Sequence, residues 1–383
     1  MPDFPGKSRL QRAWQSGLRA LDLDGIGKPK VTAGIELYRA QMPPRLLSIH
    51  ILGNLTDETG ADYHGANGRS SVVGGRVYYA LNKDPADAGA TGEAPIGFAH
   101  NTMAMATDPE NNPLAVATCG KDSNGVEWRF MPLVNVEKYY VYDTPHSMLL
   151  YLTGGMCEYS EGDGRGYVWC ERWVREPRDN GRVEDVYKGT AIGLGTVDQN
   201  TGHIFGERLG YGEIIFKKGE PSFGTFCAVE DNMWYYTFGK QGENVYLARV
   251  SKQTPITPRL YQTWDGHQFS EYRERITPVF SGYSHGTVFR TSLFGGLYKW
   301  AFIGLSSRGE RTVDIGLAEN IWGPYKMSEI INPRMLPEGH EMTSSLFVHT
   351  WAFKEDMGQL MITWNDGNTG KIVGARLQFA MRE

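Results

Sequence analysis

This chain of 383 residues lacks long apolar runs, large basic clusters and the common nucleotide and metal motifs. No window approaches the roughly eighteen consecutive apolar residues of a transmembrane helix, so we expect no membrane partner. The net charge is −5 and the longest basic cluster is Lys217-Lys218, which argues against a nucleic-acid partner. Phosphate-binding glycine loops and HExxH and zinc-cysteine motifs are missing too, so nucleotide and zinc chemistry are not expected. A Ser-His-Asp nucleophile stays open, but no GxSxG elbow supports it.

An apolar leader is also missing from the N-terminus, which reads MPDFPGKSRLQRAW. We therefore expect a cytoplasmic protein, or a secreted one from which a leader has been removed. The chain has only 4 cysteines. Cys157 and Cys170 flank a glycine-rich turn, and a hairpin there would bring them opposite each other, as in a disulfide formed in an oxidising compartment. The alternative, favoured by the tendency of free cysteine to be buried, is a pair of buried thiols.

Glycine and aromatic residues, in contrast, are abundant, with 47 glycines, 20 tyrosines and 10 tryptophans. This composition is typical of short aromatic strands joined by tight turns. The clearest example precedes the segment Trp322-Gly323-Pro324-Tyr325. Three apolar-aromatic runs, at Thr287–Phe294, Leu297–Gly304 and Thr312–Ala318, alternate there with glycine-bearing turns. The pattern predicts one small antiparallel sheet.

Weaker copies of this unit recur roughly every 50 to 70 residues, without a polar linker between them. Recurring antiparallel groups favour a β-propeller over a sandwich, and the length suits five blades. We therefore predict an all-β fold, in which residues 31–383 form a single five-bladed β-propeller. The last run, Ile372–Gln378, or the first, near Val31–Tyr38, is expected to complete a shared blade. Helical spacing in residues 8–27 predicts a short helix, so residues 1–30 form an N-terminal helical extension.

Several segments resemble the five-bladed propellers of glycosidases. They are NMWYYTFGKQGENVYLARV at 232–250, TWDGHQF at 263–269, IWGPY at 321–325 and the aromatic runs within 345–365. In pattern they are most similar to a microbial family of formerly unknown function that includes D-arabinan hydrolases, and more distantly to arabinanase and xylosidase propellers. The resemblance extends from about Asp62 to the C-terminus. These segments are typical of blade packing and are less specific for activity.

The resemblance implies a central funnel with carboxylates on its floor, one of them in a Gly-Asp-Thr turn that ends an inner strand of the first blade. The matching strand here ends in Asn82-Lys83-Asp84, so that motif is missing. Glycoside cleavage normally needs two carboxyl groups roughly 5 to 10 Å apart. We expect Asp62, Glu230 and Asp143 to be the acid, base and orienting groups.

Each of these carboxylates also has an ordinary structural interpretation. Asp62 precedes the first inner strand, where propeller sites gather, but it also suits a plain polar loop. Asp143 lies three residues before His146, a spacing that suits an acid/base dyad or a turn cap. Glu230 follows a strand in a turn, where carboxylates are mostly exposed to solvent.

Imidazole, amide and aromatic side chains are the candidates for contacts with a sugar, with structural hydrogen bonding and core packing as the alternatives. The candidates are His64, His100, Asn101, His146, Trp264, Tyr283, His285 and Trp322. His349 lies within the last blade, and in similar propellers an axial histidine can hold calcium or water. His349 is therefore the one candidate metal ligand, with a satisfied core histidine as the alternative. We expect no cofactor other than such a structural Ca²⁺.

Three functions suit this pattern. The first is a glycoside hydrolase-like enzyme that cleaves a glycosidic bond in the funnel by carboxylate acid/base chemistry. The second is a propeller repurposed as a cyclase or isomerase of secondary metabolism, whose pocket would be lined by aromatic residues and by Met103, Met105, Met148 and Met156. The third is a glycan-binding propeller without catalysis.

Overall fold

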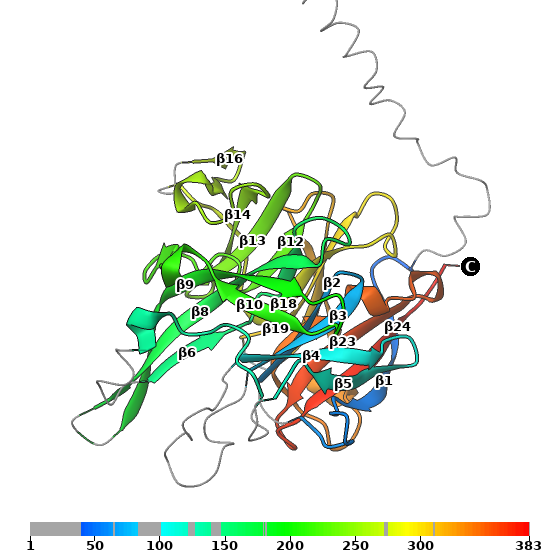
Figure 1. Cartoon of the computed structure of the whole chain (residues 1–383). Coiled ribbons are helices and arrows are strands. Elements are labelled where there is room, and N and C mark those ends of the chain that lie inside the picture. Colours follow the sequence, from blue (N-terminus) through cyan, green and yellow to red (C-terminus); the bar gives the residue numbers. More distant parts are fainter. Residues whose placement is uncertain are drawn as a thin grey trace, which may run out of the picture.

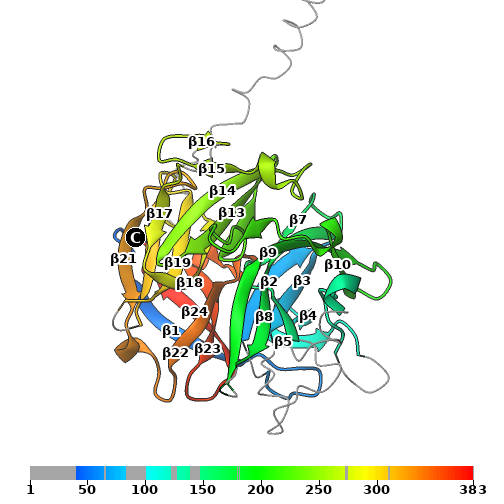
Figure 2. The ribbon, with the colours of Figure 1, turned by 90° about the vertical axis from the view of Figure 1, so that its left-hand side faces the viewer.

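The computed structural model describes residues 40–63, 66–82, 101–121, 127–138, 147–178, 180, 182–271, 275–308 and 311–382. These residues form five antiparallel sheets that follow one another around a central axis (Figures 1 and 2). The prediction of an all-β, five-bladed β-propeller is confirmed. The N-terminal extension at residues 1–30 lies outside the described residues. Within the described ranges, no helix is long and apolar enough to cross a membrane.

Each sheet is one blade, and the blades are numbered in chain order. Blade 1 contains β2 (Ala66–Val73), β3 (Arg76–Asn82), β4 (Asn101–Asp108) and β5 (Asn112–Thr118). Blade 2 contains β6 (Ser147–Tyr151), β7 (Met156–Glu158), β8 (Arg165–Pro177), β9 (Val183–Val197), β10 (Ile204–Arg208) and β11 (Phe216–Lys217). Blade 3 contains β12 (Cys227–Glu230), β13 (Trp234–Gln241), β14 (Asn244–Ser251), β15 (Gln262–Trp264), β16 (Phe269–Ser270) and β17 (Pro278–Ser281). Blade 4 contains β18 (Tyr283–Arg290), β19 (Trp300–Ser306), β20 (Val313–Ala318) and β21 (Lys326–Ile331). Blade 5 contains β22 (Met342–Val348), β23 (Gln359–Asp366), β24 (Ile372–Phe379) and β1 (Leu46–Asn54).

The ring is closed by blade 5, which takes strands from both ends of the described chain. β1 pairs antiparallel with β24, and Ile51 lies opposite Ala375. The shared blade expected at Ile372–Gln378 is therefore confirmed. Its partner from the N-terminal part of the chain is Leu46–Asn54, and the segment Val31–Tyr38 lies outside the described residues. The innermost strands β2, β7, β12, β18 and β22 contact one another in turn and complete the ring.

The apolar core lies between the blades, where five clusters each join one pair of neighbours. Alternation along the strands explains this arrangement, because successive side chains of a strand point to opposite faces. In β3, for example, Tyr78 belongs to the cluster shared with blade 2 and Tyr79 to the cluster shared with blade 5. Most aromatic residues of the chain are needed for this packing between sheets.

The pairing register of the strands decides whether Cys157 and Cys170 can form a disulfide. Cys157 in β7 lies opposite Tyr167, whereas Cys170 in β8 lies opposite Ala191 of β9. The two cysteines therefore do not face each other across a hairpin, and both are free and buried. The interpretation as buried thiols is confirmed. β7 and β8 do form the expected hairpin, but its register does not place Cys157 opposite Cys170, so the expected disulfide is wrong.

The packing between blades predicts how much stability is lost when one large core side chain is truncated. Trp364 is fully buried in the cluster between blades 4 and 5. Trp364→Ala is expected to lower the free energy of unfolding by about 3–5 kcal/mol, measured by urea denaturation. Leu47→Ala is the control, because Leu47 on β1 is 56% exposed, and its effect should stay within about 0.5 kcal/mol. Equal effects of the two substitutions would contradict a core that lies between the sheets.

Candidate functional site

Two cavities lie at opposite ends of the ring of inner strands. The start cavity, where the inner strands begin, has a volume of about 300 Å³. Its lining is Asn67, Asn82, Tyr151, Thr153, Glu171, Trp173, Asp185, His285 and Ser345. The end cavity, where the inner strands end, has a volume of about 770 Å³, and its lining includes Arg69, Ser71, Glu158, Glu230, Lys252, Thr287, Arg290 and Trp300.

The floor between the two cavities is held by Arg69 of β2, which is 4% exposed. Its Nη2 donates hydrogen bonds to the carbonyl oxygens of Phe226 (3.0 Å) and Gly286 (2.7 Å), which belong to blades 3 and 4. The guanidinium carbon also lies 4.2 Å from the ring centre of Phe347 in blade 5. A positive charge therefore occupies the axis and faces the end cavity.

Amide side chains build the floor of the start cavity. Asn67 has a positive φ of 86°, and its Nδ2 donates to the carbonyl oxygen of Leu152. Its backbone N–H donates to Ser345 Oγ at 3.2 Å, and Leu152 N–H donates to Asn82 Oδ1 at 3.2 Å. Asparagine tolerates this left-handed conformation better than most residues. These bonds join blades 1, 2 and 5 at the point where β2 and β22 begin.

Glu171 of β8 supplies an acid to the wall of the start cavity. Trp173 Nε1 donates to its Oε2 at 2.9 Å, and the Thr225 hydroxyl lies 3.1 Å from its Oε1. Burial raises the pKa of Glu171, against the opposing effects of these bonds and of the charge on Lys240. The Thr225 hydroxyl also lies 2.8 Å from the Ser222 carbonyl oxygen. Because a hydroxyl has one proton, Thr225 can give it to Ser222 and accept the proton of a neutral Glu171.

His285 of β18 lies in the same cavity and is held neutral. Its Nδ1 is buried and has no hydrogen-bond partner among the described residues. Burial first, and then the charges on Lys240 and Arg69, lower the pKa of His285 to about 4. The cavity therefore combines a carboxyl group that tends to keep its proton with an imidazole that tends to stay unprotonated. Opposite shifts of this kind are typical of acid/base pairs.

A second carboxylate, Asp185, also lines the start cavity, but it is engaged in an ion pair. Arg175 donates to its two oxygens at 2.8 and 2.9 Å across the β8–β9 pairing. Arg175 follows Glu171 by four residues in β8, which corresponds to about 13 Å along a strand. Asp185 is therefore a weak candidate for the second carboxylate of a glycosidase pair.

Two of the three carboxylates expected to be catalytic lie apart. Asp62 lies near the start of β2, where Asn54 Nδ2 donates to it at 3.0 Å and Lys371 Nζ is 2.6 Å away. Glu230 ends β12 and lines the end cavity, with Lys252 Nζ at 4.0 Å. Burial raises the pKa of Glu230 to about 7. Because the inner strands separate the two faces, Asp62 and Glu230 do not share a site.

The aromatic candidates for sugar contacts pack between blades 3 and 4. Trp264 and Trp322 are stacked with their ring centres 5.3 Å apart. The hydroxyl of Tyr283 donates to Asp314 Oδ2 at 2.7 Å, and its ring lies edge-on to Phe302. None of the three lines either axial cavity. Their role in the described structure is packing, as expected for aromatic residues between propeller blades.

The remaining candidates divide between outer strands and residues outside the described ranges. Asn101 begins β4 and is buried, and its Oδ1 accepts a hydrogen bond from Met131 N–H at 2.5 Å. Asn101 thus fixes the loop that follows blade 1. Four candidates lie outside the described residues, namely His64, His100, Asp143 and His146.

His349, the candidate metal ligand, has both ring nitrogens occupied by hydroxyl groups. Nδ1 lies 2.5 Å from Ser70 Oγ and Nε2 lies 2.8 Å from Thr363 Oγ1. Among the residues that the structure describes, no group of three histidine, cysteine or acidic side chains gathers as metal ligands. The guanidinium of Arg69 also places a positive charge on the axis. These residues do not fit an axial calcium ion, which needs several oxygen ligands and negative charge.

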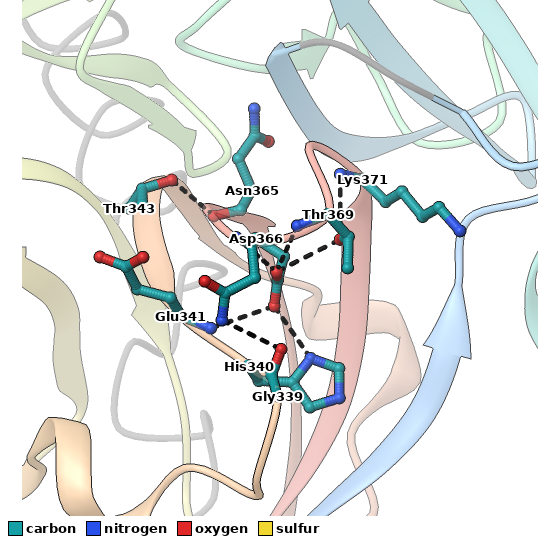
Figure 3. A network of polar contacts seen from close by, with 9 residues as sticks. Gly339, His340, Glu341, Thr343, Asn365, Asp366, Thr369 and Lys371 are labelled. Carbon is teal, nitrogen blue, oxygen red and sulfur yellow. Dashed lines mark hydrogen bonds and ion pairs between the residues drawn. The ribbon is translucent and has the colours of Figure 1, made fainter.

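The polar network around Asp366 holds the start side of blade 5 (Figure 3). One oxygen of Asp366 accepts from the N–H groups of Asn368 and Thr369, and the other lies 2.9 Å from His340 Nδ1 and accepts from Glu341 N–H. Burial pushes the pKa of Asp366 upward, but these bonds outweigh it and hold the pKa below its usual value. With both oxygens bonded, this Asp–His pair fixes a turn.

Glu171 and Asp185 were not among the site residues predicted from the sequence. A signal for Glu171 was present, because a glutamate interrupts the apolar strand YVWCERW at 167–173. Residues 171 and 173 have the same parity, so a strand places Glu171 beside Trp173 on one face. What the pattern does not show is that this face of β8 borders the axis.

No protein-family model matches the chain, and no curated protein matches it in sequence. Its fold is nevertheless similar to solved structures. A hydrolase candidate from Bacteroides ovatus has 13% identity and a TM-score of 0.50, over 83% of this chain and 87% of that one. A GH62 α-L-arabinofuranosidase catalytic domain from Coprinopsis cinerea has 10% identity and a TM-score of 0.49, over 86% and 97%. Its structural neighbours thus include glycoside hydrolases, and the shared property is the propeller fold.

Burial of His349 predicts a pH dependence of stability. Burial first, and the charge of Arg69 second, lower its pKa from 6.5 to about 3, so the folded state binds fewer protons than the unfolded state. The stability that His349 contributes is complete above pH 6.5 and is lost as the pH falls toward about 3. Below pH 6.5, the unfolding free energy of the wild type should fall relative to that of His349→Asn, by up to about 1.4 kcal/mol per pH unit. Parallel pH profiles in urea denaturation would contradict a neutral His349.

Proposed function

We propose that the protein is a carbohydrate-active enzyme that cleaves a glycosidic bond in the start cavity. Glu171 is the general acid and His285 the base that activates water. The observation that carries this proposal is that both side chains line one cavity, in environments that shift their pKa values in opposite directions. The propeller fold shared with glycoside hydrolases supports the reaction class by analogy.

The proposed reaction is a single displacement. Glu171 gives its proton to the glycosidic oxygen as the bond to the anomeric carbon breaks, and the leaving sugar departs as an alcohol. The oxygen of a water molecule forms the new bond to that carbon, and its proton passes to Nδ1 of His285. Both groups then return to their resting states by proton exchange with solvent. Because water attacks the face opposite the leaving group, the anomeric configuration is inverted.

The lining of the start cavity suits a sugar better than an apolar substrate. Asn67, Asn82 and Ser345 offer amide and hydroxyl groups for sugar hydroxyls, and Trp173 offers a ring face. The methionines expected around a cyclase substrate do not line this cavity, and Met103 is buried between blades 1 and 2. A glycan is therefore the substrate that the described residues favour.

Replacement of the acid tests this function. Glu171→Gln should lower kcat on aryl furanosides and cell-wall glycans about 10²–10⁴-fold, and His285→Asn by a similar factor, because each removes one proton transfer. The matched control is Asp62→Asn, since the ion pair with Lys371 keeps Asp62 away from the cavity, and its activity should match the wild type.

The pH profile adds a second readout. Activity of the wild type should decline on the acid side as His285 protonates near pH 4, and on the alkaline side as Glu171 loses its proton. Full activity of Glu171→Gln, or equal losses in Asp62→Asn and Glu171→Gln, would contradict the assignment. Sugar binding without turnover in the wild type would instead indicate a glycan-binding propeller.

A further inference from the structure

The end cavity contains a buried cation with few partners. Arg69 contributes to its lining, and burial lowers the pKa of the guanidinium, although arginine stays charged in proteins. Within the described ranges, no carboxylate forms an ion pair with it, and its Nε has no hydrogen-bond partner. Burial of an ion without a counter-charge is costly, so an anion that reaches Arg69 would gain a strong interaction.

Two hydroxyl groups beside Arg69 also have protons to donate. Ser71 Oγ accepts a hydrogen bond from Met156 N–H at 2.8 Å, and Thr287 Oγ1 accepts one from Val348 N–H at 3.1 Å. Both residues line the end cavity, and neither hydroxyl proton has an acceptor among the described residues. A hydroxyl whose oxygen is occupied by a backbone donor acts toward a ligand mainly as a donor. Arg69, Ser71 and Thr287 thus form a set of donors.

The acidic residues that line this cavity are Glu158, Glu161, Glu230 and Asp231, and they come from blades 2 and 3, whereas Arg69, Ser71 and Thr287 come from blades 1 and 4. Glu158 accepts hydrogen bonds from the N–H groups of Gly74, Gly162 and Gly164, which fixes its carboxylate between the β2–β3 turn of blade 1 and the β7–β8 turn of blade 2. Glu230 lies beside Lys252, whose Nζ is 4.0 Å from Glu230 Oε2. The cavity therefore has a floor of donors and a separate wall of acceptors.

We propose that the end cavity is a second binding site, in which Arg69, Ser71 and Thr287 bind the carboxylate of a small hydroxylated organic acid such as a sugar acid. The carboxylate neutralises the guanidinium, and the acceptors on the acidic wall bind hydroxyl groups of the same molecule. The cavity volume of about 770 Å³ accommodates an organic acid of this size. This site is distinct from the start cavity and does not depend on the proposed hydrolase activity.

Isothermal titration calorimetry on the full chain tests the site. Sodium glucuronate, sodium acetate and sodium chloride are titrated separately into the protein in dilute zwitterionic buffer. The expected result is saturable binding of one glucuronate, weaker binding of acetate and no saturable heat with chloride. Arg69→Met should weaken glucuronate binding at least about tenfold, because it removes the charge-assisted bonds.

Two further variants keep the test informative if Arg69→Met does not fold. Ser71→Ala and Thr287→Val each remove one hydroxyl donor and should weaken glucuronate binding several-fold, with folding checked by circular dichroism. Arg290→Gln removes an exposed cation of the same cavity and distinguishes general electrostatic attraction from binding at Arg69. The proposal is overturned if glucuronate shows no saturable binding, if chloride binds equally well, or if only Arg290→Gln weakens binding.

Discussion

The axis of this propeller is organised by one buried guanidinium. Arg69 extends from the innermost strand of blade 1 and bonds to backbone carbonyls of blades 3 and 4. It stacks on Phe347 of blade 5, and in blade 2 a side chain at Gly155 would have its Cβ 2.9 Å from Arg69 Cδ. All five blades therefore meet one side chain. A buried charge that relies on carbonyl oxygens from several sheets requires those sheets to keep their positions.

The same charge sets the chemistry of its neighbours. It contributes to keeping His285 and His349 unprotonated, and it makes the axis unsuitable for a calcium ion. The charge of Arg69 also makes the two cavities chemically different. The start cavity contains the neutral imidazole and the desolvated carboxyl group of Glu171, whereas the end cavity contains the donors of the guanidinium. One residue thus underlies both proposals, acid/base chemistry on one face and anion binding on the other.

Much of the fold could be predicted from the sequence, because alternation and glycine turns are local signals. The strands of blade 4 and the shared blade at Ile372–Gln378 followed from such patterns. The candidate site was harder, since it depends on which strand positions border the axis. Asp62 and Glu230 were expected to share one site, yet they lie on opposite faces, because Asp62 precedes the inner strand β2 and Glu230 ends the inner strand β12. Glu171 was overlooked because the direction of its side chain depends on how β8 packs in blade 2, which the sequence does not show.

The most direct test of this account is the pKa of His285, measured by NMR titration of the imidazole in the folded protein. Burial and the nearby charges of Lys240 and Arg69 predict a pKa of about 4. In Arg69→Met the value should rise, because one of these charges is removed. A pKa near 6.5 in the wild type would contradict the account, since His285 would then be neither desolvated nor under the influence of the axial guanidinium.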